Sequence, residues 1–270
     1  MQLQVIVDNM SGATSLLGEH GLAMFLESEE ARILIDGGQG KALLPNATAL
    51  GIDLSRLDHI VLSHGHYDHT WGVAQVLLKK ADTLVWAHPA FMGAHYAIRK
   101  GQPCFIGCNL RGDLINHKPI LGCVEITKDV FAFDVPVESR NEEFVPSVAH
   151  LVISKDGGFI QDDFLDDISL VVRGRHGLSV ILGCAHAGSV NVLERAASLF
   201  GTREFYAVIG GMHLGEQSTE MIDRITSILV EEFQISMFRP AHCTGFAAAA
   251  MLAAKAPDVK WAAAGTVIEL

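Results

Sequence analysis

Short apolar runs and two kinds of periodicity alternate along the chain. Early stretches alternate like strands, and the polar residues 28–30 between two of them favour a hairpin. Further on, apolar residues at helical spacing separate the strands, which is typical of β-α-β units with parallel strands. The predicted strands are 3–7, 23–27, 32–36, 58–63, 83–86, 168–172, 178–182, 205–209, 235–238 and 259–270, and the predicted helices lie at 70–80, 193–200, 221–229 and 245–256.

Both halves of the chain therefore mix hairpins with β-α units. Two mixed sheets packed face to face, with helices outside, would bury all of these apolar faces. We predict an α/β (α+β) fold, a four-layer αββα sandwich, formed as a single domain over residues 1–270. Residues 101–146 hold four prolines and many glycines, so we expect an irregular insertion there, without regular structure.

Composition narrows the classes of function. The 270 residues are 49% hydrophobic and 19% charged, which is typical of a globular protein. The 20 basic residues against 31 acidic ones give a net charge of −11, which argues against nucleic acid and anionic membranes as partners. The sequence shows no secretory leader and no membrane-spanning apolar run, and an odd number of cysteines, five, is typical of a reducing compartment. We expect a cytoplasmic protein.

The strongest chemical signal lies where a predicted strand ends and a helix begins. It reads Ser63-His64-Gly65-His66-Tyr67-Asp68-His69-Thr70. Four potential ligands within six residues need partners if they are buried, and a loop can turn all four toward one point. Two metal ions about 3.5–4 Å apart would use all of them. Imidazole and carboxylate together suit zinc, iron, manganese or cobalt better than calcium.

This H-x-H-x-D-H loop resembles the hallmark of the metallo-β-lactamase superfamily, and the order of elements is similar over essentially the whole chain. The resemblance implies that His64 and His66 bind one metal ion and that Asp68 and His69 bind the other. It also implies that Asp36, at the end of an earlier strand, orients the histidine loop from behind the ligands.

The later ligands depart from the pattern of the superfamily. Cys184 stands where the superfamily has an Asp that bridges both metals, and His186 follows two residues later. We assign His186 as the ligand, with a Cys184 thiolate as the competing assignment. His242, after the last core strand, matches the final histidine.

A further motif histidine is replaced by the acidic run 162–167. Either His186 takes its place or one Asp of the run contributes; a solvated acidic loop is the simpler alternative. His213 lies at the same sheet edge, and we assign it a role in catalysis together with Asp68. His20 is a weaker candidate.

Other residues of these types carry less signal. We interpret His88 and His95 as structural or surface residues. Cys104, Cys108 and Cys123 have no matching histidine spacing, so buried thiols are a better interpretation than a further metal site.

Six segments together resemble one branch, named for a dihydropterin–ribofuranosylaminobenzene phosphate synthase, whose members are mostly described only as metal-dependent hydrolases. The segments are Asp8-Asn9, Glu19-His20-Gly21-Leu22, the histidine loop, Gly183-Cys184-Ala185-His186-Ala187-Gly188, Gly210-Gly211-Met212-His213-Leu214 and His242-Cys243-Thr244-Gly245.

We therefore expect an enzyme with two divalent transition-metal ions, zinc first and iron or manganese as alternatives. It would hydrolyse an ester, lactone, thioester or phosphoester in a small-molecule substrate of anionic or phosphorylated character. One alternative is a synthase that uses the metals as Lewis acids, with a basic pocket for phosphate drawn from Arg99, Lys100, Arg111 and Arg140. Two further alternatives remain. One is a di-iron redox site, which in this fold usually works with an attached flavin domain, and the chain has no room for such a domain. The other is a metal-binding module without turnover.

Overall fold

The computed structural model describes residues 1–270, apart from the side chain of Leu114. Its first sheet has seven strands, in the order β17 (Val267–Glu269), β1 (Gln2–Val7), β2 (Ala23–Glu27), β3 (Arg32–Ile35), β4 (His59–Val61), β5 (Leu84–Ala87) and β8 (Asn116–Pro119). Its second sheet has six, in the order β16 (Gln234–Pro240), β15 (Glu204–Gly210), β14 (Gly177–Leu182), β13 (Ile168–Gly174), β10 (Val130–Asp134) and β9 (Cys123–Thr127).

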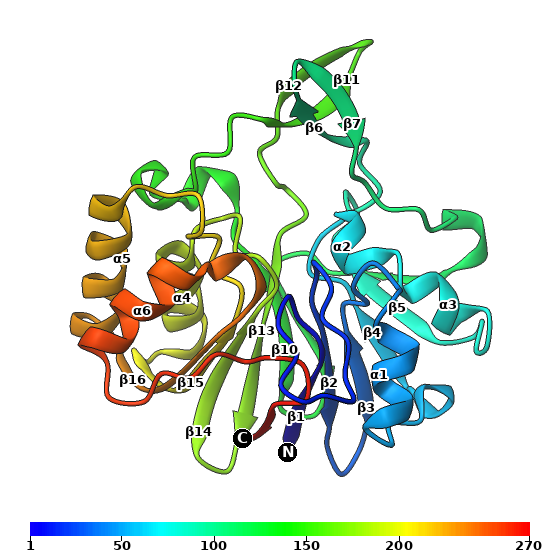
Figure 1. The fold of residues 1–270 in the computed structure, drawn as a ribbon, viewed down its shortest axis with the longest axis horizontal. Helices are drawn as coiled ribbons and strands as arrows, with labels where there is room; N and C mark the ends of the chain where they lie inside the picture. Colours follow the sequence, from blue (N-terminus) through cyan, green and yellow to red (C-terminus); the bar gives the residue numbers. More distant parts are fainter.

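The helices cover the outer faces of these two sheets, as Figure 1 shows. They are α1 (Leu43–Ala49), α2 (Tyr67–Thr70) and α3 (Val73–Leu77) on the seven-stranded sheet, and α4 (Ser189–Phe200), α5 (Thr219–Glu231) and α6 (Phe246–Lys255) on the six-stranded sheet. Short 3₁₀ turns lie at Leu54–Arg56, Gly112–Leu114, Val137–Ser139, Glu142–Phe144 and His242–Thr244. Among the described residues, no helix is long and apolar enough to cross a membrane.

Alternation along the strands divides the core into three layers. In β13, Leu170 and Val172 pack between the two sheets, whereas Val171 packs beneath the helices of the second sheet. In β3, Ile33 faces the other sheet and Leu34 faces α1. This period of two is what a strand buried on both faces requires. The predicted four-layer αββα sandwich is confirmed.

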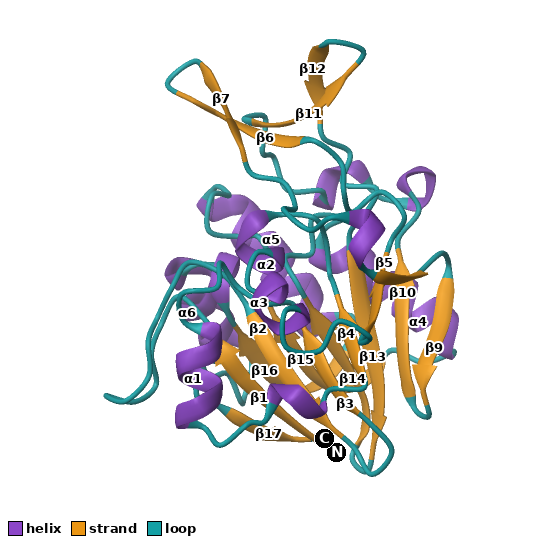
Figure 2. Cartoon of the chain, turned by 90° about the vertical axis from the view of Figure 1, so that its right-hand side faces the viewer, coloured by secondary structure: helices purple, strands orange, loops and turns teal.

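A third, smaller sheet was not predicted. It has the order β12 (Gly158–Gln161), β11 (Leu151–Lys155), β6 (His95–Arg99) and β7 (Gln102–Phe105), and it projects from the sandwich at the end opposite the chain termini (Figure 2). The expectation of an irregular segment over 101–146 is wrong, because β7, β8, β9 and β10 lie there. Pro103 and Pro119 occupy edge strands, where a missing N–H is tolerated.

Other differences are smaller. The predicted helix 70–80 is two helices, α2 and α3, that meet at Gly72, where an added Cβ would overlap the carbonyl oxygen of Gly37. The predicted terminal strand 259–270 shortens to β17.

Parallel pairing brings the chemically interesting loops to one rim. β3, β4 and β5 run parallel in the first sheet, and β14, β15 and β16 run parallel in the second. The carboxyl ends of parallel strands open on the same edge, where loops gather functional groups. Asp36 follows β3, the histidine loop follows β4, and Cys184, His213 and His242 follow β14, β15 and β16.

Candidate metal centre

The histidine loop is held in a conformation that only a glycine permits at its centre. A Cβ on Gly65 would overlap the carbonyl oxygen of Phe91. The Gly65 N–H donates to Asp166 Oδ2 at 2.7 Å. His66 directly precedes α2, so Asp68 and His69 lie in the first turn of that helix. The close backbone approach and the short helix direct all four side chains toward the rim.

His64, His66 and His186 form a three-histidine group. One ring nitrogen from each lies within 4.8 Å of the other two. All three side chains are buried. Within the described part of the chain, the Nε2 atoms of His64 and His66 and both ring nitrogens of His186 have no hydrogen-bond partner. Burying a polar atom without a partner is costly, so three such imidazoles facing one point indicate a cation-binding position.

Asp68, His69 and His242 form a second group, the aspartate–histidine group. His69 Nε2 lies 3.3 Å from His242 Nε2 and 4.0 Å from Asp68 Oδ2, and His242 Nε2 lies 3.4 Å from Asp68 Oδ2. Two nitrogen ligands of a tetrahedral zinc ion, each at 2.0–2.1 Å, are about 3.4 Å apart. The spacing in this group is therefore that of ligands around one ion.

Hydrogen bonds at the Nδ1 atoms of His64 and His69 fix which ring nitrogen faces the rim. Asp36 Oδ2 accepts a hydrogen bond from His69 Nδ1 at 2.7 Å and another from Ser63 Oγ at 2.7 Å, and Ser63 N donates to Asp36 Oδ1. Ser63 Oγ is also 2.9 Å from His64 Nδ1. These bonds place hydrogens on the Nδ1 atoms and leave the Nε2 lone pairs of His64 and His69 free to bind a metal ion. Asp36 thus has the orienting position expected for it.

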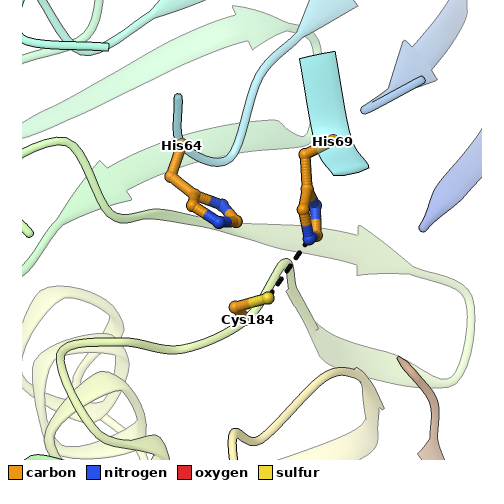
Figure 3. A group of neighbouring side chains, drawn as sticks. All are labelled: His64, His69 and Cys184. Carbon is orange, nitrogen blue, oxygen red and sulfur yellow. Dashed lines mark hydrogen bonds between the residues drawn. The ribbon is translucent and has the colours of Figure 1, made fainter. Parts of the chain in front are cut away.

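Cys184 lies beside one member of each group, His64 and His69 (Figure 3). Its Sγ is 3.2 Å from His69 Nε2, and it forms a set with His64 and His69 in which the ligand atoms all lie within 4.8 Å of one another. The structure places His186 in the three-histidine group and Cys184 at the junction. The two residues proposed as competing ligands therefore occupy different positions, because Ala185 between them has a left-handed φ of 54° that redirects the chain.

The protonation preferences of these residues suit a cation. Burial lowers the pKa of His66 to about 3, and burial also lowers the pKa values of His64 and His186, which keeps these rings neutral. Burial opposes ionisation of Asp68, but hydrogen bonds from His20 and His242 outweigh it and hold the pKa of Asp68 well below its usual value. Neutral imidazoles and an ionised carboxylate are the forms that bind metals.

Comparisons with known proteins agree with this geometry. A family model described as the metallo-beta-lactamase superfamily matches residues 17–102, which include the histidine loop. An uncharacterized protein of Methanocaldococcus jannaschii is 32% identical over 256 residues, which cover 91% of each chain. The chain belongs to the metallo-β-lactamase superfamily.

Two further relatives have more specific descriptions. The 7,8-dihydropterin-6-methyl-4-(beta-D-ribofuranosyl)-aminobenzene-5'-phosphate synthase of the same organism is 26% identical and covers 92% of this chain and 89% of its own. A crystal structure described as a metal-dependent hydrolase of the beta-lactamase superfamily is 28% identical, with a TM-score of 0.86 over 100% of this chain and 99% of the other. The predicted likeness to the synthase branch is confirmed, and the metallo-β-lactamase fold implies binding of divalent metal ions.

His213 and His20 approach the centre from two sides. His213 has a left-handed φ of 49°, and its ring centroid is 4.4 Å from that of His186. His20 Nε2 lies 3.1 Å from Asp68 Oδ2, although the His20 side chain is 54% exposed. Both residues line the pocket above the metal ligands. Their roles in catalysis or binding stay predictions.

The acidic run 162–167 and His95 support the site from behind. Sequence reasoning allowed a structural role for His95 and a contribution from one Asp of the run, but it did not pair them beside the metal ligands. His95 Nδ1 lies 2.6 Å from Asp162 Oδ2, and its ring centroid is 5.3 Å from that of His66. Asp166 holds Gly65, and Asp167 Oδ2 accepts a hydrogen bond from the Ala187 N–H at 3.0 Å. Asp162, Asp166 and Asp167 are buried, so the run is not a solvated loop. The buried N–H groups of Gly65 and Ala187 need acceptors. Four aspartates within six residues were the sequence signal that could have identified these acceptors.

A pocket of about 340 Å³ opens above the two ligand groups. Metal-ligand candidates form its floor, and residues of the small sheet and its approaches, namely Ala97, Arg99, His150 and Leu151, form one wall. The unexpected sheet therefore shapes the space in which a substrate would lie.

Proposed function

We propose that this chain is a metal-dependent hydrolase with a dinuclear centre. The observation that carries the proposal is the convergence of buried imidazole nitrogens that, within the described residues, have no partner, at His64, His66 and His186. The neighbouring aspartate–histidine group has the spacing of a second ion's ligands. Nitrogen, carboxylate and thiol donors suit zinc first, with iron or manganese as alternatives.

Two such ions, when bound, would supply a water nucleophile near neutral pH and would draw charge from the carbonyl or phosphoryl oxygen under attack. His64, His66 and His186 would hold one ion, and Asp68, His69 and His242 the other, with Cys184 beside His64 and His69. Asp36 keeps the His69 ring in the required tautomer. Asp68 lines the pocket, and its carboxylate can accept a hydrogen bond from an attacking water, which would align that water with the substrate.

His213 is the candidate proton donor to the leaving group. Burial lowers the pKa of His213, but the neighbouring Cys243 outweighs burial and raises it. The raised pKa favours the protonated ring, from which a proton can be transferred. The His213 ring lines the pocket beside His186, so this proton is within reach of a bound substrate.

Arg99 gives the pocket a preference for anionic substrates. It lines the pocket at the end of β6. The other basic residues considered for phosphate binding are elsewhere: Arg140 donates to the carbonyls of Val135, Asp163 and Phe164, and Arg111 pairs with Asp113 at 2.7 Å. The guanidinium of Arg99, which lies beside the Tyr67 hydroxyl, suits a phosphate or carboxylate group.

The same residue favours a second candidate function. A synthase that joins a pterin to a ribosyl phosphate would need a phosphate site beside Lewis-acidic metals, and the synthase relative carries such a product in its name. Arg99 would then hold the phosphate of the substrate rather than the anionic end of an ester.

We propose a cytoplasmic location, which five free cysteines support.

Turnover of a substrate panel tests the hydrolase. The zinc- or manganese-loaded protein is offered an aryl ester, a thioester, a lactone and an aryl phosphodiester. We expect hydrolysis of at least one class of substrate. His66→Ala should lower this activity by more than about 100-fold, which exceeds the usual effect of replacing a residue that only hydrogen-bonds to a metal ligand. His176→Ala, on the far turn between β13 and β14, is the matched control and should keep full activity.

The outcomes separate the candidates. Metal-loaded protein that hydrolyses none of the four classes contradicts the hydrolase. Binding of ribose 5-phosphate by that protein, weakened in Arg99→Gln, would then favour the synthase, and neither binding nor turnover would favour a metal-binding module.

Metal binding should also release a proton. Burial lowers the pKa of His242, but its hydrogen bond with Asp68 outweighs burial and raises the pKa to about 9 in the metal-free protein. The ring is then protonated near neutral pH, and an ion can bind Nε2 only after that proton leaves. Affinity should therefore rise with pH up to about 9 and level off above it.

Calorimetric titration of metal-free protein with zinc, in buffers of different ionisation enthalpy, measures this release. We expect about one proton from this group near neutral pH. Zinc binding with no proton release and no dependence on pH would contradict the assignment of His242 as a ligand.

A further inference from the structure

Two cysteine sulfurs meet at the rim beside the metal ligands. Cys184 follows β14 and Cys243 follows β16, with β15 between these strands. Strands two places apart in a sheet are about 10 Å apart, too far for a direct contact between the sulfurs. The loops nevertheless converge, because Cys184 Sγ, Cys243 Sγ and a His213 ring nitrogen lie within 4.8 Å of one another.

Gly211, at the end of the middle strand, makes this meeting possible. Its N–H donates to Gly183 O at 3.0 Å, which holds the loop after β15 against the loop after β14. A Cβ on Gly211 would lie 2.6 Å from Cys243 Sγ and 3.4 Å from Cys184 Cα. The space that a side chain would fill is therefore occupied by the Cys243 sulfur, whose Sγ is 3.7 Å from Cys184 O.

Both thiols are free, and both line the pocket, so a small molecule can reach them. Cys243 is the more accessible, since it is partly exposed whereas Cys184 is buried at 3% exposure. Cys104 and Cys123 lie on strands β7 and β9, away from this rim.

We propose that Cys184 and Cys243 form a modification site, a disulfide that a small peroxide closes across Gly211. Cys243 Sγ attacks one oxygen of hydrogen peroxide, the O–O bond breaks, and water leaves as a sulfenic acid forms on Cys243. Cys184 Sγ then displaces the hydroxyl group from that sulfur as a second water, and the S–S bond forms. The two electrons come from the thiols, and peroxide is reduced to two molecules of water.

The cross-link would change the centre as well as the rim. The Cys184 sulfur stands 3.2 Å from His69 Nε2, and in a disulfide it has no thiolate to offer a metal ion. This consequence rests on the proposed function, whereas the cross-link itself does not. Oxidised protein should therefore lose metal ions that reduced protein retains.

Peptide mapping after peroxide treatment tests the proposal, in metal-free and in metal-loaded protein. We expect a linked pair of peptides containing Cys184 and Cys243, a mass lower by two hydrogens, and reversal by dithiothreitol. Cys243→Ser should abolish the linked pair, and Cys123→Ser, the matched control on an outer strand, should keep it.

Circular dichroism of each variant shows whether it is folded. Recovery of Cys184 and Cys243 in metal-free wild type as separate alkylated thiols or separate sulfinic acids would overturn the proposal. Scoring the metal-free protein keeps the result independent of the metal centre, and metal release with a chromophoric chelator reports the second consequence separately.

Discussion

Removal of the metal ions should lower the free energy of unfolding by about 4 kcal/mol per site. This value is relative to protein in a solution whose free metal concentration is about 1,000 times the dissociation constant. A ligand that binds only the folded chain stabilises it by mass action. The binding affinity itself includes the gain from pairing the buried nitrogens of His64, His66 and His186, which have no hydrogen-bond partner among the described residues.

Thermal unfolding with excess zinc, and again with a chelator, measures the effect. We expect a lower melting temperature in the chelator for wild type and for His176→Ala. His66→Ala should show a smaller difference, because one site is already impaired. Identical melting of wild type in zinc and in chelator would contradict the metal centre.

Asp36→Asn should weaken binding to the aspartate–histidine group by about 10- to 100-fold, the usual effect of losing an orienting partner. Asp36 accepts hydrogen bonds from Ser63 and His69 and is fully buried. An amide NH₂ in place of Oδ2 would donate to His69 Nδ1, and the hydrogen of that ring would move to Nε2, which could then no longer bind a metal ion.

The backbone should tolerate this change. Asp36 has a left-handed φ of 58°, a conformation that asparagine adopts readily. Competition with a chromophoric chelator measures the metal affinity, and Asp163→Asn, an exposed member of the acidic run, is the matched control. Equal affinities of Asp36→Asn and wild type would show that the tautomer of His69 is not set by Asp36.

The elements of the sandwich could be predicted because each buries a face with its own periodicity. Strands such as β13 and β14 alternate between two apolar layers, and α5 has apolar residues on one side. The small sheet could not be predicted in this way, since β12 is exposed along its whole length and its apolar residues do not alternate with polar ones.

The site divides along the same line. Its local part, the loop from His64 to His69, could be predicted from the sequence because one strand end and one short helix carry four ligands. The position of Cys184 relative to His186 could not be predicted, because it depends on the left-handed backbone of Ala185 between them. His95 reaches the site only by pairing with Asp162, 67 residues away, and periodicity within one element contains no such information.

Elemental analysis of the purified protein tests the central claim most directly. Wild type is measured beside His66→Ala, Asp68→Ala and the His176→Ala control. We predict about two transition-metal ions per chain in wild type and in the control, and a clear loss in each ligand variant. Trace metal at the same level in all four proteins would contradict the account.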